Sequence, residues 1–406
     1  MTGLSPQEQA LVEPIEPAPM LAQVLAWAAV NSGTGNLAGL ADMASRLAEA
    51  FAALPGEIAM VDAAPVTAIA VDGREAAVAN GRHLVCRVRP DATRRVLLTG
   101  HMDTVYAEDD PFQQCDWIDA ETLHGPGTAD MKAGLALMLA GLSAFERSNP
   151  EMGYDVLINS DEETGSLSSA SLIRALAAGK LAALTYEPAL AAGVLAGARP
   201  GSGNFSAVLR GRSAHAGRNP RDGRNALLAA ADLAMRLAAL GGPDLSVNPA
   251  RIDGGGPNNR VPDLTVLRFN IRPQTPAAAT WAQARIAELS AQVAAAHEVS
   301  IELHGGFSRP PKPVDPAAER LFALVTRAAA DLGQICSRAD TGGVCDGNNI
   351  AACGVPVVDT MGAVGGAIHS PDEFLKVASL AERAKLTALT LYRLDRAGPD
   401  SARVPS

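Results

Sequence analysis

The sequence has few aromatic residues, few cysteines and no long apolar run. Aromatic residues make up 4% of the 406 residues, and the five cysteines include no CxxC pair. This spacing suggests no disulfide framework, so we expect a protein of the reducing cytoplasm. No segment approaches the roughly 20 uninterrupted apolar residues of a membrane span. The apolar run at 20–30 has no lysine or arginine before it, so we expect no secretory signal.

The chain also has no excess of positive charge. Its formal net charge is −10, with 34 lysines and arginines against 44 aspartates and glutamates. A nucleic-acid groove needs a basic face, so we expect neither a nucleic-acid nor a membrane partner. Hydrophobic residues at 48% and charged residues at 19% are typical of a soluble globular protein. The length suits two domains.

Strand-like and helical segments alternate over the first two hundred residues. Helical patterns at 20–30 and up to about 54 are separated by a turn-rich stretch, Asn31–Asn36. This alternation predicts an α/β fold with a central sheet flanked by helices. We expect a helix over 132–145 and strands at 66–71, 83–88, 95–99 and 154–159.

From about Gly201 the predicted order changes to β-α-β-β-α-β, which is the ferredoxin-like α+β arrangement. A Pro/Gly-rich segment at 305–314 indicates a hinge back to the first domain. We therefore predict a discontinuous domain of residues 1–199 and 308–406, interrupted by residues 200–307. In the inserted part we expect strands at 204–209, 245–252, 265–271 and 300–304, and helices at 225–240 and 276–296.

A histidine lies at the end of a predicted buried strand. The strand runs into Gly100-His101-Met102-Asp103, and open α/β sheets place their ligands at the carboxyl ends of strands. Asp103 can accept the second ring N–H of His101 and fix its tautomer. Alone, His101 is equally compatible with an ordinary surface or core role.

Carboxylates follow at two further places. A Gly/Pro loop, His124–Thr128, delivers Asp130 to the start of a helix, where an isolated aspartate is ordinarily an N-cap. The segment Ser160–Ser166 puts three adjacent carboxylates at a strand end. It is either a solvated acidic turn or a pair of glutamates with different tasks, one binding a metal and the next acting as general base.

Two more candidates complete an inventory that suits metal. Glu187 ends a short apolar run, and His369 lies in a Gly-rich loop near the C-terminus. Two imidazoles and three carboxylates suit a pair of zinc ions sharing one carboxylate, and manganese or cobalt would also fit. The five candidate ligands are His101, Asp130, Glu163, Glu187 and His369.

These motifs carry a family resemblance. The segments GHMD, HGPGTADMKAG, SDEETGS, TYEP and AIHSPDEF resemble, in order and spacing, those of the co-catalytic zinc metallopeptidases, the family of glutamate carboxypeptidases, aminoacylases and acetylornithine deacetylases. The resemblance spans nearly the whole chain and is strongest to the bacterial glutamate carboxypeptidase branch. It implies a zinc-dependent catalytic domain interrupted by a dimerisation or lid domain, and hence a homodimer. Met131 departs from the family pattern, since several relatives have a second aspartate there, but no ligand is lost.

The resemblance assigns the metal ligands. It implies that His101 and Glu187 bind one zinc ion, that Glu163 and His369 bind the other, and that Asp130 bridges the two. A hydroxide bridging the ions would then attack the amide bond of an N-acyl amino acid or a C-terminal residue.

Other positions receive supporting roles from the same resemblance. Glu162 would be the general base, and Asp103 would orient His101. His215 would reach the partner subunit's site and stabilise the oxyanion, while Asn259 and Arg272 would assist with the substrate. Without the resemblance, His215 would be an ordinary solvated loop residue.

The residues themselves add a candidate for the substrate's α-carboxylate. Arg309, at the predicted hinge, can bind a carboxylate bidentately, and Arg199 is a second candidate that is equally compatible with an ordinary surface cation. An anion-binding arginine favours a carboxypeptidase or deacylase. The alternatives are an aminopeptidase or dipeptidase of the same family, and a non-catalytic binding module that keeps the fold.

Overall fold

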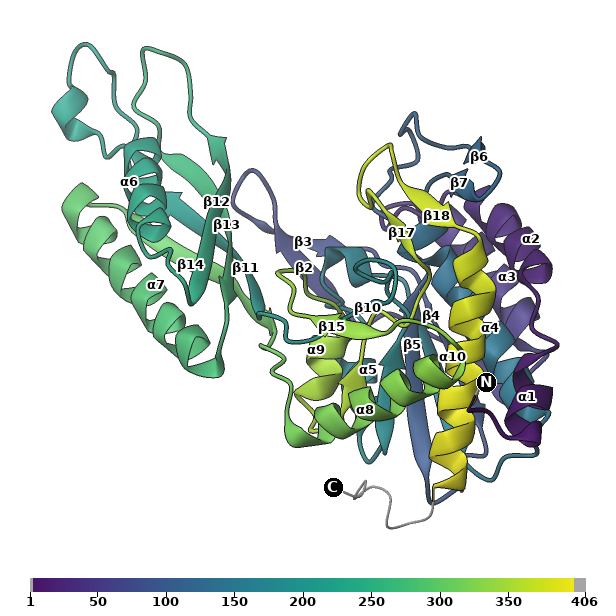
Figure 1. Cartoon of the computed structure of the whole chain (residues 1–406). Helices are drawn as coiled ribbons and strands as arrows, with labels where there is room; N and C mark the ends of the chain where they lie inside the picture. The colour runs from purple at the N-terminus through teal and green to yellow at the C-terminus, as the bar shows by residue number, and fades with distance from the viewer. Residues whose placement is uncertain (1–2, 398–406) are drawn as a thin grey trace.

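A six-stranded sheet lies at the centre of the larger part of the computed structural model, which describes residues 3–397 (Figure 1). Its strands run in the order β1-β4-β8-β5-β9-β16. The last four strands pair in parallel, whereas β1 pairs antiparallel with β4, and β4 pairs antiparallel with β8. The strands are β1 (Glu57–Val61), β4 (His83–Val88), β8 (Gly153–Asn159), β5 (Arg95–His101), β9 (Ala182–Thr185) and β16 (Val357–Val358).

Helices cover both faces of this sheet. Side chains alternate along β5, so that Leu98 packs into one apolar core and Leu97 into another on the opposite face. The first core contains α1 (Pro6–Val12), α2 (Pro17–Ala28), α3 (Leu37–Phe51), α4 (Ala133–Glu146), α8 (Pro316–Asp331) and α10 (Ala378–Arg396). The second contains α5 (Ala170–Ala177) and α9 (Asp346–Ala351). The predicted α/β architecture is confirmed.

Three small sheets accompany the central one. A four-stranded sheet, in the order β17-β18-β7-β6, joins two segments that are far apart in the sequence. Its strands are β6 (Asp116–Asp119), β7 (Thr122–His124), β17 (Gly365–Gly366) and β18 (Phe374–Lys376). The other two are the pair β10 (Val194–Ala196) and β15 (Ser337–Ala339) and the hairpin β2 (Val66–Ile69) and β3 (Glu75–Val78).

The inserted segment forms its own antiparallel sheet in the order β12-β13-β11-β14. Two helices pack on one face of it, away from the larger part, and share its apolar core (Figure 1). The elements are β11 (Ser202–Arg210), α6 (Ala226–Ala238), β12 (Leu245–Gly254), β13 (Leu264–Pro273), α7 (Pro276–His297) and β14 (Ser300–Arg309). The ferredoxin-like arrangement is therefore confirmed, and the domain boundaries remain predictions.

One expectation about the hinge needs adjustment. β14 does not stop near residue 304 but continues to Arg309, because it keeps pairing with β11 as far as Ser202. Two backbone hydrogen bonds between Arg199 and Lys312, each 2.9 Å long, then join the two segments that connect the inserted sheet to the larger part.

Two further expectations concern the whole chain. All five cysteines are free, as the absence of a disulfide framework predicted. Among residues 3–397, no helix combines the length and apolar character that crossing a bilayer requires.

Candidate metal centre

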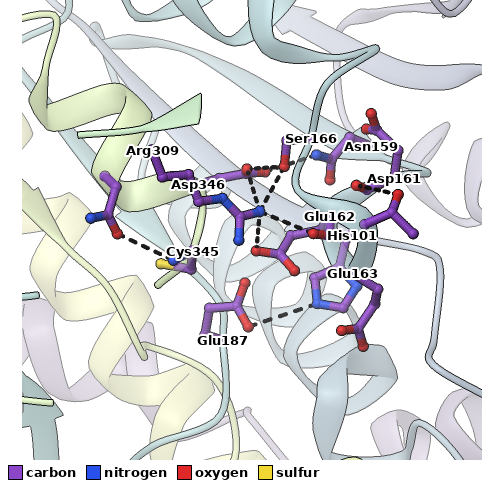
Figure 2. Close-up of polar contacts among 12 residues, drawn as sticks. His101, Asn159, Asp161, Glu162, Glu163, Ser166, Glu187, Arg309, Cys345 and Asp346 are labelled. Atoms are coloured by element: carbon purple, nitrogen blue, oxygen red, sulfur yellow. Dashed lines mark hydrogen bonds and ion pairs between the residues drawn. The ribbon is translucent and has the colours of Figure 1, made fainter. Parts of the chain in front are cut away.

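Three candidate ligands follow adjacent parallel strands. β5 lies between β8 and β9, and the carboxyl ends of all three lie at the same edge of the sheet. His101 is the last residue of β5, Glu163 follows β8, and Glu187 follows β9. Figure 2 shows these side chains turned toward one another. The position is the one where open parallel sheets bind ligands.

Asp130 and His369 come from two loops. Asp130 precedes α4, and its peptide bond to Met131 is cis. Gly134, in the first turn of α4, lies where a Cβ would collide with the carbonyl oxygen of Tyr186, so glycine permits this helix end to approach the residue before Glu187. His369 follows β17 and has φ 62°, a left-handed conformation that is uncommon outside glycine.

The five side chains form two triads that share Asp130. Asp130 Oδ1 lies 3.2 Å from His101 Nε2, and Glu187 Oε2 lies 3.7 Å from the same nitrogen. On the other side, His369 Nε2 lies 3.2 Å from Asp130 Oδ2 and 3.1 Å from Glu163 Oε2. In each triad the three ligand atoms lie within 4.8 Å of one another. Nitrogen and carboxylate donors in this number suit zinc.

The carboxylates of the cluster shift the pKa values of both histidines upward. Burial lowers the pKa of His101, but neighbouring carboxylates, Glu187 foremost, outweigh it and raise the pKa well above its usual value. Hydrogen bonds to Asp130 and Glu163 raise the pKa of His369 to about 10. Burial raises the pKa of Glu163 to about 7. A divalent cation would take the place of the protons that both imidazoles otherwise hold.

Asp103 lies beside His101 but contacts it through a different atom from the one expected. His101 Nδ1 lies 2.9 Å from the backbone oxygen of Asp103 and 3.5 Å from its carboxylate. The carboxylate instead accepts hydrogen bonds from the Thr34 hydroxyl (2.8 Å) and from the backbone N–H groups of Glu162 and Glu163 (3.2 Å each). Asp103 thus fixes the turn that carries both glutamates, while its carbonyl holds Nε2 of His101 toward Asp130.

Glu162 and Arg309 form a buried ion pair. Nη2 of Arg309 donates to Glu162 Oε1 (2.7 Å), to the Glu162 carbonyl (3.0 Å) and to Ser166 Oγ (2.9 Å) (Figure 2). Asp346 lies 3.6 Å from the same nitrogen. Burial raises the pKa of Glu162 well above its usual range, and the guanidinium opposes that rise. Arg309 is 6% exposed; protein groups engage its Nη2, whereas its Nε has no hydrogen-bond partner within the described residues.

Arg199 is equally buried, at 6% exposed, but is held through a different nitrogen. Its Nε donates to Asp359 at 2.7 Å, and no hydrogen bond within residues 3–397 engages its two terminal nitrogens. Burial lowers the pKa of Arg199, but Cys345, Asp359 and Glu187 outweigh this effect and raise the pKa above its usual value. The guanidinium therefore stays charged. Cys345 itself caps α9 and lies 3.4 Å from the Asp359 carboxylate. These contacts leave both terminal nitrogens of Arg199 without an acceptor among the described residues, whereas one terminal nitrogen of Arg309 is already engaged.

The three candidates in the inserted segment do not join the cluster. His215 is exposed, and its Nδ1 accepts hydrogen bonds from the backbone of Gly217 and Arg218. Asn259 is exposed, and its carbonyl accepts from Ala216. Arg272 donates to the Gly342 carbonyl at 2.7 Å. Among the described residues, no contact links these side chains to the five candidate ligands, so their roles remain predictions.

Two buried carboxylates around the centre were not among the candidates. Asp346 contacts Arg309, Ser166 and Asn159, and Glu373 accepts backbone hydrogen bonds from the loop of Asp130. Glu373 lies in the AIHSPDEF motif, whereas Asp346 lies in none of the motifs described above. The partner of each comes from a distant part of the chain.

Comparisons with known proteins agree with the geometry. A family model described as peptidase family M20/M25/M40 matches residues 97–393. Carboxypeptidase G2 from Pseudomonas sp. (strain RS-16) is 28% identical over 334 residues, which cover 79% of each chain. Succinyl-diaminopimelate desuccinylase from Pseudomonas syringae is 28% identical over 319 residues, covering 73% of this chain and 81% of that protein.

Solved structures show the same fold. The aminopeptidase PepT from Bacillus cereus superposes with a TM-score of 0.71 at 24% identity, covering 94% of this chain and 99% of that one. At this identity the likeness establishes the fold alone. Because the family model spans more than half of the chain, the protein belongs to peptidase family M20/M25/M40 and is a metal-dependent hydrolase.

Proposed function

We propose that the protein holds two zinc ions per subunit and hydrolyses the amide bond of N-acyl amino acids or C-terminal residues, as a glutamate carboxypeptidase does. The proposal rests on the position of the Asp130 carboxylate, whose two oxygens each lie 3.2 Å from a different histidine. A single carboxylate shared in this way suits two cations, and manganese or cobalt would also fit the donors. The likeness to Carboxypeptidase G2 supports the substrate class.

The residues around the cluster divide the remaining work. Two bound cations would polarise the scissile carbonyl and lower the pKa of a coordinated water. Glu162 takes the proton of the attacking water and passes it to the nitrogen of the departing amine, which breaks the carbon–nitrogen bond. Arg309 fixes the carboxylate of Glu162 through its 2.7 Å hydrogen bond. His215 of a second subunit is proposed to stabilise the oxyanion, with Asn259 and Arg272 beside the substrate.

We propose that Arg199, rather than Arg309, binds the substrate's carboxylate. Both terminal nitrogens of Arg199 lack a hydrogen-bond acceptor within the described part of the chain, whereas in Arg309 one of the two, Nη2, already has three. Asp359 fixes Arg199 from behind, so its fork is oriented before the substrate arrives. A cationic recognition group favours a substrate with a free carboxylate over one recognised by its amino group.

We further propose a homodimer formed through the inserted segment, in the cytoplasm. Strand β12 is an edge of its sheet, with unpaired backbone groups on one side. Next to it, α6 exposes Met235 and Leu228, at 74% and 60%. An open sheet edge beside exposed apolar side chains fits a symmetric contact between two copies, because one patch then covers its own equivalent.

The metal dependence of hydrolysis tests the proposal. We expect the purified protein to release free amino acid from N-acyl amino acids, including N-acyl glutamate, and from peptides with a free C-terminus. Chelation should abolish the release and added zinc should restore it. The panel should include peptides blocked at either end, with product measured by chromatography.

Glu162→Gln provides the matched control. It should bind zinc as the wild type does but lower kcat by about 10²–10⁴-fold, because it removes the general base and keeps the ligands. Retained turnover in this variant would contradict the role of Glu162. Cleavage only of substrates with a free amino group would identify an aminopeptidase or dipeptidase, and zinc binding without any turnover would identify a binding module.

Substitution of Arg199 tests the substrate contact. Arg199→Lys keeps a cation for Asp359 but loses the forked terminal nitrogens. Charge-assisted hydrogen bonds contribute roughly 1.5–3 kcal/mol, so we expect KM to rise by about 10–100-fold for a substrate with a free carboxylate. KM for its amidated analogue should stay unchanged. Arg309→Lys is the comparison and should lower kcat; a rise in KM confined to Arg309→Lys would refute our assignment.

Charge at the exposed face of α6 tests the dimer. Met235→Asp places a carboxylate in the proposed contact, so we expect the dimer to dissociate to monomers at micromolar concentration, measured by sedimentation. Ile335→Asp changes an equally prominent apolar side chain, 85% exposed, outside the inserted segment and should leave the dimer intact. A wild-type monomer, or a dimer unaffected by Met235→Asp, would exclude this contact.

A further inference from the structure

Glu373 is a completely buried carboxylate surrounded by hydrogen-bond donors. Its Oε1 accepts from the backbone N–H groups of Ala129 and Asp130, each at 2.9 Å. Its Oε2 accepts from the backbone N–H of Gly127 (3.0 Å) and from the Tyr106 hydroxyl (2.7 Å). The side chain has no exposure to solvent. Three backbone N–H donors and one hydroxyl suit a carboxylate and not an uncharged amide.

These contacts connect the two loops that supply opposite sides of the cluster. Glu373 lies four positions after His369 in the turn between β17 and β18. Its carboxylate binds the loop that ends in Asp130, and its backbone carbonyl accepts from Gly125 of the same loop at 3.1 Å. The Tyr106 hydroxyl also lies 2.8 Å from the Ser370 carbonyl, so its one proton is shared between this carbonyl and Glu373, and it contacts the His369 turn a second time.

We infer that Glu373 is a positioning residue that sets the distance between Asp130 and His369 and thereby the metal affinity of the centre. The inference rests on the proposed metal site. Asp130 lies in the short helical turn Thr128–Lys132, where its own backbone departs from helical angles (φ −115°, ψ 91°). The direct bond from its N–H to Glu373 therefore replaces the support that a helix or strand would give. Groups that orient metal ligands commonly contribute 10–100-fold to metal affinity.

The substitution Glu373→Gln tests this role. It preserves size but places an NH₂ group against a backbone N–H or the Tyr106 hydroxyl, so at least one donor loses its acceptor. We expect the metal-free, folded variant to bind Zn²⁺ about 10–100-fold more weakly than wild type in competition with a chromophoric chelator. Tyr106→Phe removes only one of the four donors and should show a smaller loss; it serves as the test if Glu373→Gln does not fold.

Glu146→Gln is the matched control. Glu146 is likewise a hydrogen-bonded carboxylate, although only partly buried; it pairs with Arg89 at 2.6 Å and lies at the far end of α4. This variant should lose thermal stability without losing Zn²⁺ affinity. Wild-type affinity in Glu373→Gln, or an equal loss in Glu146→Gln, would overturn the positioning role. Failure of the wild-type protein to bind Zn²⁺ would instead overturn the metal centre and this inference with it.

Discussion

The carboxylate of Asp130 faces two imidazoles, one at each oxygen, and the surrounding elements hold these three side chains in place. Three parallel strands end beside it and supply His101, Glu163 and Glu187. A bound carboxylate, Glu373, holds the backbone of Asp130 itself. Burying so many carboxylates together is unfavourable unless positive charge compensates them. The pKa values of both histidines are raised, so protons on these imidazoles or bound cations can compensate the negative charge of the carboxylates.

Positive charge also arrives from the two segments that lead to the inserted sheet. Arg199 and Lys312 both pair with Asp359, at 2.7 and 3.5 Å, and Arg309 pairs with Glu162. Each cation is nearly buried, so each would be costly without its partner. These ion pairs thus fix the two connecting segments to the larger part of the protein, next to the candidate metal centre.

Much of this organisation was predictable from the sequence. His101, Glu163 and Glu187 stood at the ends of apolar runs, and parallel strands bring such ends to one edge. The partners of Arg309 could not be predicted from the sequence. The direction of its side chain depends on β14 continuing as a strand to Arg309, which the sequence pattern did not indicate. The same holds for Asp103, which uses its carbonyl rather than its carboxylate. Short exposed strands such as β6 (Asp116–Asp119) carried no alternating pattern to reveal them.

The number and position of bound metal ions decide whether Asp130 is shared between two cations. A crystal of the zinc-loaded protein, measured on both sides of the zinc absorption edge, would locate the ions by anomalous scattering. Our account predicts two peaks per subunit, roughly 3.5–4 Å apart, with Asp130 between them. A single peak, or two peaks that do not share Asp130, would contradict it.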